Sequence, residues 1–150
     1  MLVAYNFTEA MRDVLTRSRQ EALRLGHEYV GAEHLLLGTL ASARGVTSVM
    51  LDSVDVPSVR AEIERRTGLG QAPPRAAEDL PYTSRAKRVL ELAMREAREQ
   101  SHAAVSSEHL LLGLLREEQG ITAEVLAEAG LRLDVARSIM LAHLATSKPR

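Results

Sequence analysis

The chain lacks several residue types and patterns that would commit it to particular chemistry. It has no cysteine and no tryptophan, and only 3% of its 150 residues are aromatic. Without cysteine, disulfides, thiolate nucleophiles and thiolate-bound zinc are excluded. Its apolar stretches are short and interrupted, and no basic segment leads into an apolar one at the start. We therefore expect no signal peptide and no membrane span, and a cytoplasmic protein.

An excess of charge of one sign is also absent, since the formal net charge is −1. This balance argues against nucleic acid or an anionic membrane as a partner held by bulk electrostatics. Basic residues do gather between positions 85 and 98, but acidic residues alternate with them, which predicts a mixed, solvated face. The acidic residues are Glu91, Glu96 and Glu99.

What the chain does contain is an internal repeat with a spacing of 75 residues. The sequence EHLLLG at 33–38 returns at 108–113, and Thr8 returns as Thr83. Such a repeat predicts two similar structural units around a pseudo-twofold axis. We expect a single domain over 1–150, with one copy at about 5–67 and the other at about 81–145. The segment at about 68–80, rich in glycine, proline and alanine, is predicted to be a mobile linker.

The repeat predicts an all-α fold of eight helices, four in each copy. In the second copy, apolar residues fall at helical spacing from Ala86 to Ala97. Thr8 and Thr83 precede the first helix of each copy as N-caps. The remaining helices are expected at about 32–41, 46–53 and 58–66 and at 107–117, 121–129 and 134–145. No β-strand is predicted.

These motifs together resemble the Clp N-terminal repeat domain, most closely that of ClpC-type AAA+ unfoldases. The resemblance runs from about Tyr5 to about Leu144 and rests on residues 7–9, 31–38, 82–87 and 107–117. It implies a non-enzymatic domain that receives substrate proteins and adaptors for an unfoldase and its partner peptidase. No G-x-x-x-x-G-K-[ST] phosphate-binding loop occurs in the chain. The chain is therefore expected to be either an excised N-domain or a free-standing accessory or decoy protein that modulates degradation.

The resemblance also implies a ligand, phosphorylated arginine, whose guanidinium an acidic residue in each copy would bind. The matching carboxylates are Glu33 and Glu108, and Thr8 and Thr83 stand at helix N-termini where a phosphoryl group could bind. We expect one pocket from Thr8 with Glu33 and another from Thr83 with Glu108. The family's threonine is replaced by Ala32 in the first copy, whereas Ser107 keeps a hydroxyl, so the first pocket is expected to be the weaker.

The same residues also have a purely structural interpretation. A glutamate in the first turn of a helix is favoured by the helix dipole, and a threonine before a helix is commonly only a cap. The histidines are seven residues apart in each copy, which is poor spacing for a metal site, so they are expected to be packed or capping residues. A small metal-binding protein or hydrolase that uses Glu33–His34 and Glu108–His109 is the distant alternative. We expect no cofactor.

A second candidate surface lies where the two copies join. Leu2, Val3 and Tyr5 precede the first helix, and Leu80 and Tyr82 precede the corresponding helix of the second copy. If these segments pack together, they form a small apolar groove. In the resembled family, such a surface receives adaptors and small molecules.

Overall fold

The computed structural model describes residues 6–73 and 76–147, which form eight α-helices. The all-α prediction is confirmed, and the helix bounds differ from the expected ones by a few residues. The first copy holds α1 (Glu9–Arg24), α2 (Ala32–Ser42), α3 (Val46–Met50) and α4 (Val56–Thr67). The second copy holds α5 (Ser84–Glu99), α6 (Ser107–Arg116), α7 (Ile121–Glu128) and α8 (Leu133–Ser147). A 3₁₀ turn, η2 (Ala77–Asp79), precedes α5.

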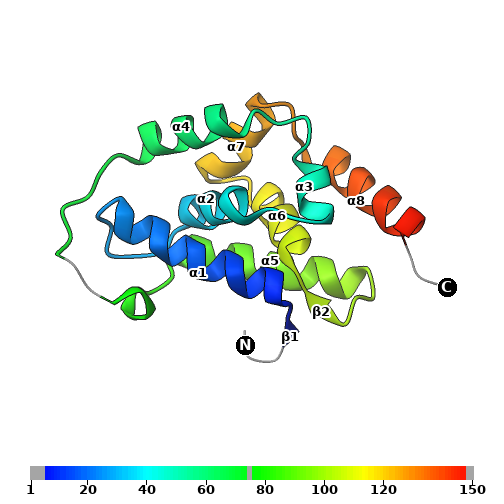
Figure 1. Ribbon diagram of the computed structural model, residues 1–150, viewed down its shortest axis with the longest axis horizontal. Coiled ribbons are helices and arrows are strands. Elements are labelled where there is room, and N and C mark those ends of the chain that lie inside the picture. The colour runs from blue at the N-terminus through cyan, green and yellow to red at the C-terminus, as the bar shows by residue number, and fades with distance from the viewer. Residues whose placement is uncertain (1–5, 74–75, 148–150) are drawn as a thin grey trace.

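Helices α2 and α6 form the centre of the molecule, with α4 and α7 on one side and α1 and α5 on the other (Figure 1). Their leucine triplets are fully buried, so these helices are apolar on more than one face. Gly38 and Gly113 allow α2 and α6 to pack closely on α1 and α5. A Cβ atom at Gly38 would lie 2.7 Å from the Val14 carbonyl oxygen, and one at Gly113 would lie 2.7 Å from that of Val89.

Thr8 and Thr83 cap α1 and α5, as predicted. The Thr8 hydroxyl accepts from the Met11 amide at 3.1 Å, and the Thr83 hydroxyl accepts from the Ala86 amide at 3.0 Å. Each hydroxyl satisfies an amide that has no partner within its helix. The two helices therefore begin at equivalent positions of the repeat.

The two copies are joined by short parallel backbone pairings that the sequence did not predict. Strand β1 (Asn6–Phe7) of the first copy pairs with β2 (Ala104–Val105) of the second. A parallel bridge joins Val30 to Tyr82 at the equivalent place. The expectation of no strand was wrong because two residues are too short to show the alternation that marks a strand. In both places, the segment before the first helix of one copy pairs with the segment that leads into the central helix of the other copy.

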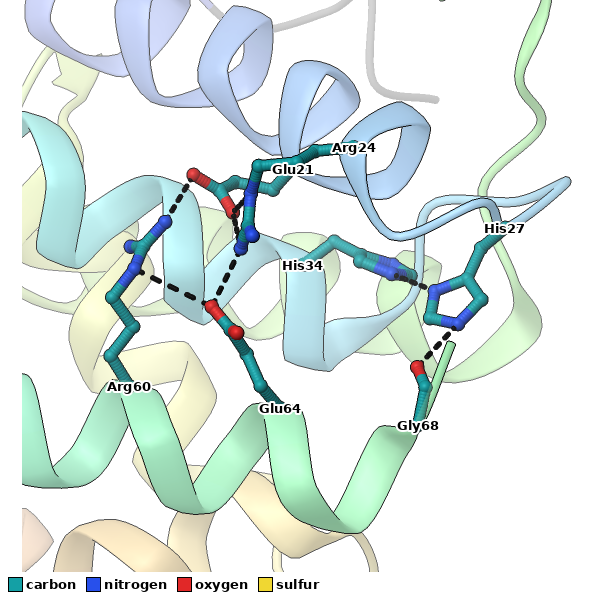
Figure 2. A network of polar contacts seen from close by, with 7 residues as sticks. All are labelled: Glu21, Arg24, His27, His34, Arg60, Glu64 and Gly68. Carbon is teal, nitrogen blue, oxygen red and sulfur yellow. Dashed lines mark hydrogen bonds and ion pairs between the residues drawn. The ribbon is translucent and has the colours of Figure 1, made fainter. Parts of the chain in front are cut away.

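A buried carboxylate on the first helix of each copy is enclosed by arginines. Glu21 accepts from Arg24 at 2.8 Å and from Arg60 at 2.5 Å (Figure 2). Its counterpart Glu96 accepts from Arg116 and Arg137 at 2.8 and 2.6 Å and is 1% exposed. The prediction that Glu96 lies on a solvated face was therefore wrong. In each copy, hydrogen bonds from two arginines offset the desolvation cost of burying the carboxylate.

The first part of the linker is bound to the turn between α1 and α2. The amides of Gly70 and Ala72 donate to the carbonyls of Leu25 and Gly26 at 2.7 and 2.9 Å. Gly26 has a φ of +75°, and a Cβ atom there would lie 2.5 Å from the Gly70 oxygen. The expectation of a mobile linker therefore does not describe residues 68–72, which pair with this turn.

Among residues 6–73 and 76–147, no helix is long and apolar enough to cross a membrane.

Candidate functional site

The N-terminus of α1 and the N-terminus of α6 meet across the junction of the two copies. The Thr8 amide donates to the Val105 carbonyl at 3.0 Å. The Thr8 hydroxyl lies 2.7 Å from the hydroxyl of Ser106, the N-cap residue of α6. Glu108 stands two residues further, in the first turn of α6. We call Thr8, Ser106 and Glu108 the α1–α6 site.

The repeat generates a second site of the same backbone geometry. The Thr83 amide donates to the Val30 carbonyl at 3.0 Å, and Gly31 takes the place of Ser106 as the N-cap of α2. Glu33 stands in the first turn of α2. Its carboxylate lies over Gly31, because a Cβ atom on that glycine would lie 2.6 Å from Glu33 Oε1. We call Gly31, Glu33 and Thr83 the α2–α5 site.

The structure therefore combines the predicted site residues in the opposite way from the sequence-based expectation. Thr8 lies near Glu108 rather than Glu33, and Thr83 lies near Glu33 rather than Glu108. Within a copy, the first two helices are antiparallel neighbours, so α2 begins beside the far end of α1, some 24 Å from Thr8 for 16 residues. The predicted pairs Thr8 with Glu33 and Thr83 with Glu108 were wrong for this reason.

Both carboxylates are half-buried, and neither has a hydrogen bond or ion pair to another described residue. Glu33 lies close enough to Tyr29 to affect its titration: burial raises the pKa of the Tyr29 phenol, and the nearby Glu33 charge raises it further. A half-buried carboxylate at a helix N-terminus, open on one side, is suited to bind a guanidinium. The amides and hydroxyls of the opposing helix N-terminus favour an anion.

The hydroxyl of Ser107 faces the interior rather than a ligand. It lies 2.8 Å from the Thr47 hydroxyl in α3, and both side chains are buried. The repeat places Ala32 and Thr122 at the corresponding positions, and the Thr122 hydroxyl is buried with no hydrogen-bond partner in the described chain. A hydroxyl at position 32 would therefore contact the other copy rather than a ligand. Its absence at Ala32 affects the packing between the copies, which was not the reason given for a weaker first pocket.

The histidines form one hydrogen-bonded pair in each copy and hold the cap of the central helix. The Gly31 amide donates to His34 Nδ1 at 2.9 Å, so His34 donates from Nε2 to His27 Nδ1 at 2.7 Å. His27 in turn donates from Nε2 to the Gly68 carbonyl at 3.0 Å (Figure 2). Burial, with the neighbouring His27, lowers the pKa of His34 to about 4.

The second copy repeats this arrangement with Ser106, His109 and His102. Burial, with the neighbouring His102, lowers the pKa of His109 to about 4. The described residues contain no group of three or more side chains that could hold a metal ion. The prediction that the histidines are packed or capping residues is confirmed.

Of the residues predicted to line the apolar groove, Leu80 and Tyr82 are described by the structure. Leu2 and Tyr5 lie outside the described residues. Leu80 is 5% exposed and belongs to the core, so it does not line an open groove. Tyr82 is half-buried, and its hydroxyl accepts from Arg19 at 3.1 Å.

Two residues near the sites escaped sequence reasoning. The sequence marks Ser106 only as a residue that precedes a helix, yet its hydroxyl bonds Thr8 of the other copy. Tyr29 was not considered. A position-by-position comparison of the copies would have marked both, since Ser106 aligns with Gly31 and Tyr29 aligns with Ala104.

Comparison with known proteins identifies relatives over nearly the whole chain. A family model described as "Clp repeat (R) N-terminal domain" matches residues 6–129 and 82–147. The chain is 40% identical over 144 residues to the chaperone protein ClpB of Oceanobacillus iheyensis, which covers 95% of this chain. The same figures hold for the negative regulator of genetic competence ClpC/MecB of Bacillus subtilis. In both cases the chain spans only 17% of the relative's length.

Solved structures show the same fold. The N-terminal domain of ClpD from Arabidopsis thaliana superposes with a TM-score of 0.76 at 24% identity, covering 93% of this chain and 95% of that one. The N-domain of ClpV from Vibrio cholerae gives a TM-score of 0.74 at 17% identity, covering 99% and 90%.

Proposed function

The chain belongs to the family of Clp repeat N-terminal domains, and on this basis we propose that it binds phosphoarginine-tagged proteins or adaptors for a ClpC-type unfoldase. The role is non-catalytic: the chain captures a protein, and an associated unfoldase and peptidase degrade it. The cytoplasmic location expected from the sequence is part of this proposal.

One observation carries the proposal, the meeting of a carboxylate and an opposing helix N-terminus at two equivalent junctions. Glu108 stands in the first turn of α6, which meets the N-terminus of α1 through the backbone pairing of Thr8. Glu33 stands in the first turn of α2, which meets the N-terminus of α5 through that of Thr83. A phosphorylated arginine carries a guanidinium and an anion on adjacent atoms. A site with an acceptor on one side and amide and hydroxyl donors on the other matches both groups.

Each site pairs a carboxylate of one copy with a threonine of the other, and this crossed arrangement supports ligand binding across the two copies. Because each site takes one helix N-terminus from each copy, neither copy forms a site alone. A tagged protein would meet two sites on one domain, and display of several domains on an unfoldase would increase the apparent affinity without new contacts.

The experiment that tests the proposal is calorimetric titration of the purified chain with free phosphoarginine. We expect binding near micromolar Kd, about −8 kcal/mol. Free arginine and inorganic phosphate serve as matched controls, because each offers only one of the two groups, and both should bind far more weakly. A folded chain that gives no heat at millimolar phosphoarginine would overturn the phosphoarginine proposal.

A further inference from the structure

We propose that the two sites are not equivalent and that phosphoarginine fills the α2–α5 site first, with at least about tenfold higher affinity than the α1–α6 site. This inference rests on the proposed function and concerns the same sites. Three independent differences between the copies support it, and all three favour the α2–α5 site.

The first difference is the side chain at the N-cap of the central helix. In the α1–α6 site, the Ser106 hydroxyl lies 2.7 Å from the Thr8 hydroxyl, so a phosphoryl group must compete with or displace this contact. In the α2–α5 site, Gly31 has no hydroxyl to bond Thr83, and the Glu33 carboxylate lies where a side chain at this position would be. The Thr83 hydroxyl accepts from Ala86, and its proton has no acceptor among the described residues, so it is available to an anion.

The second difference is the charge at the helix N-terminus that would receive the phosphoryl group. Helix α1 begins with Glu9, whereas α5 begins with Ser84 and has no acidic residue in its first turn. An acidic first turn already uses the favourable helix dipole and repels a second anion. The N-terminus of α5 is therefore the better phosphoryl site.

The third difference is an aromatic ring beside only one of the carboxylates. Tyr29 is 37% exposed and stacks on His27, with ring centroids 5.4 Å apart and an interplanar angle of 6°. The Glu33 charge lies close enough to the Tyr29 phenol to raise its pKa. A guanidinium bound to Glu33 can also pack on an aromatic face, which Ala104 cannot offer in the α1–α6 site.

These differences reverse the order expected from the sequence. The absence of a hydroxyl at Ala32 was expected to weaken the site that contains Glu33. The equivalent Ser107 hydroxyl is buried against Thr47, so its absence removes a contact between helices and no ligand group.

The test follows each site separately by NMR while phosphoarginine is titrated into the ¹⁵N-labelled chain. The amide of Ala86 reports the α2–α5 site, and the amide of Met11 reports the α1–α6 site, since each donates to the capping threonine. We expect Ala86 to saturate at a ligand concentration at least about tenfold lower than Met11. Glu33→Gln should abolish the tighter event, whereas Glu108→Gln should abolish the weaker one.

Two further variants test the effect of the N-cap side chain and provide a control. Ser106→Gly should bring the affinity of the α1–α6 site toward that of the other. Glu28→Gln removes an exposed carboxylate from the same turn as Tyr29 without touching either site, and should leave both events unchanged. Equal affinities, or a tighter event lost in Glu108→Gln, would overturn this inference while leaving the proposed function intact. Absence of any binding would overturn both.

Discussion

The hydroxyl of Ser107 lies 2.8 Å from the hydroxyl of Thr47, so that a buried hydrogen bond joins the central helix of the second copy to α3 of the first. The equivalent bond in the other direction is missing, because Ala32 stands opposite Thr122 in the repeat and the Thr122 hydroxyl is buried without a partner among the described residues. A buried hydroxyl without a hydrogen bond is destabilising.

We therefore expect Ala32→Ser to stabilise the fold by about 1 kcal/mol, because the new hydroxyl can satisfy Thr122. Ser107→Ala should destabilise it by about 1–3 kcal/mol, since it leaves Thr47 unsatisfied. Urea denaturation of both variants measures the change. Thr122→Val is the matched background: there, Ala32→Ser should give no gain. A gain that persists in that background would contradict the explanation.

Glu96 should be the most sensitive carboxylate on the second copy's first helix. Burial raises the pKa of its carboxyl, but the hydrogen bonds from Arg137 and Arg116 outweigh this and hold the pKa below its usual range. Glu96→Gln removes the charge that both arginines bind, and we expect a loss of about 2–3 kcal/mol in the free energy of unfolding. Glu91→Gln, at an exposed position of the same helix, should cost less than about 0.5 kcal/mol. Equal losses in the free energy of unfolding of the two variants would show that the burial of Glu96 does not determine the effect of removing its charge.

The histidine pairs predict a specific pH dependence of stability. The pKa of His34 is lowered to about 4, so between this value and the ordinary 6.5 the unfolded chain binds more protons than the folded one. The contribution of His34, at most about 3 kcal/mol, is present above pH 6.5 and is lost as the pH falls toward 4.

His34→Gln should reduce the slope of the free energy of unfolding against pH. Urea denaturation at several pH values between 4.5 and 7 measures it, and His109→Gln should remove a similar part. The buried carboxylates Glu21 and Glu96 act at lower pH, because their lowered pKa values place their losses below about 4.5. An unchanged slope in both histidine variants would contradict this assignment.

Gly26 and Ser101 occupy equivalent turns and offer a test of the bound linker. Both have positive φ, +75° and +60°, but only at Gly26 does the Gly70 backbone approach within 2.5 Å of where a Cβ atom would be. Gly26→Ser should destabilise the fold by about 2 kcal/mol or more and increase proteolysis after residue 68. Ser101→Gly should change stability by less than about 1 kcal/mol. Unchanged proteolysis in Gly26→Ser would contradict the bound state of this segment.

The sequence was sufficient for the helices and their caps, because both arise from local patterns. Thr8 and Thr83 were predicted to be N-caps, and each accepts from an amide in the first turn of its helix. It was insufficient for the crossed pairing, since a repeat predicts equivalent positions but does not say whether a contact lies within or between copies. The contact of Thr8 with Ser106 depends on a two-residue strand pair that has no sequence signal.

Neither a buried charge nor a buried hydroxyl without a hydrogen-bond partner could be recognised from the sequence. Glu96 lies in a stretch of alternating charges that is typical of a solvated face, and only the positions of Arg116 and Arg137 show that it is enclosed. Ala32 was recognised as a departure from its family, but its consequence depends on Thr122 in the other copy. Such pairs become visible only when the three-dimensional arrangement is known.

We propose that each ligand site combines a carboxylate of one copy with a helix N-terminus of the other. A crystal structure of the chain with phosphoarginine tests it most directly. We expect the guanidinium within hydrogen-bond distance of Glu33 and the phosphoryl group at Thr83 and the N-terminus of α5. A ligand held by Glu33 without Thr83, or bound away from both junctions, would contradict it.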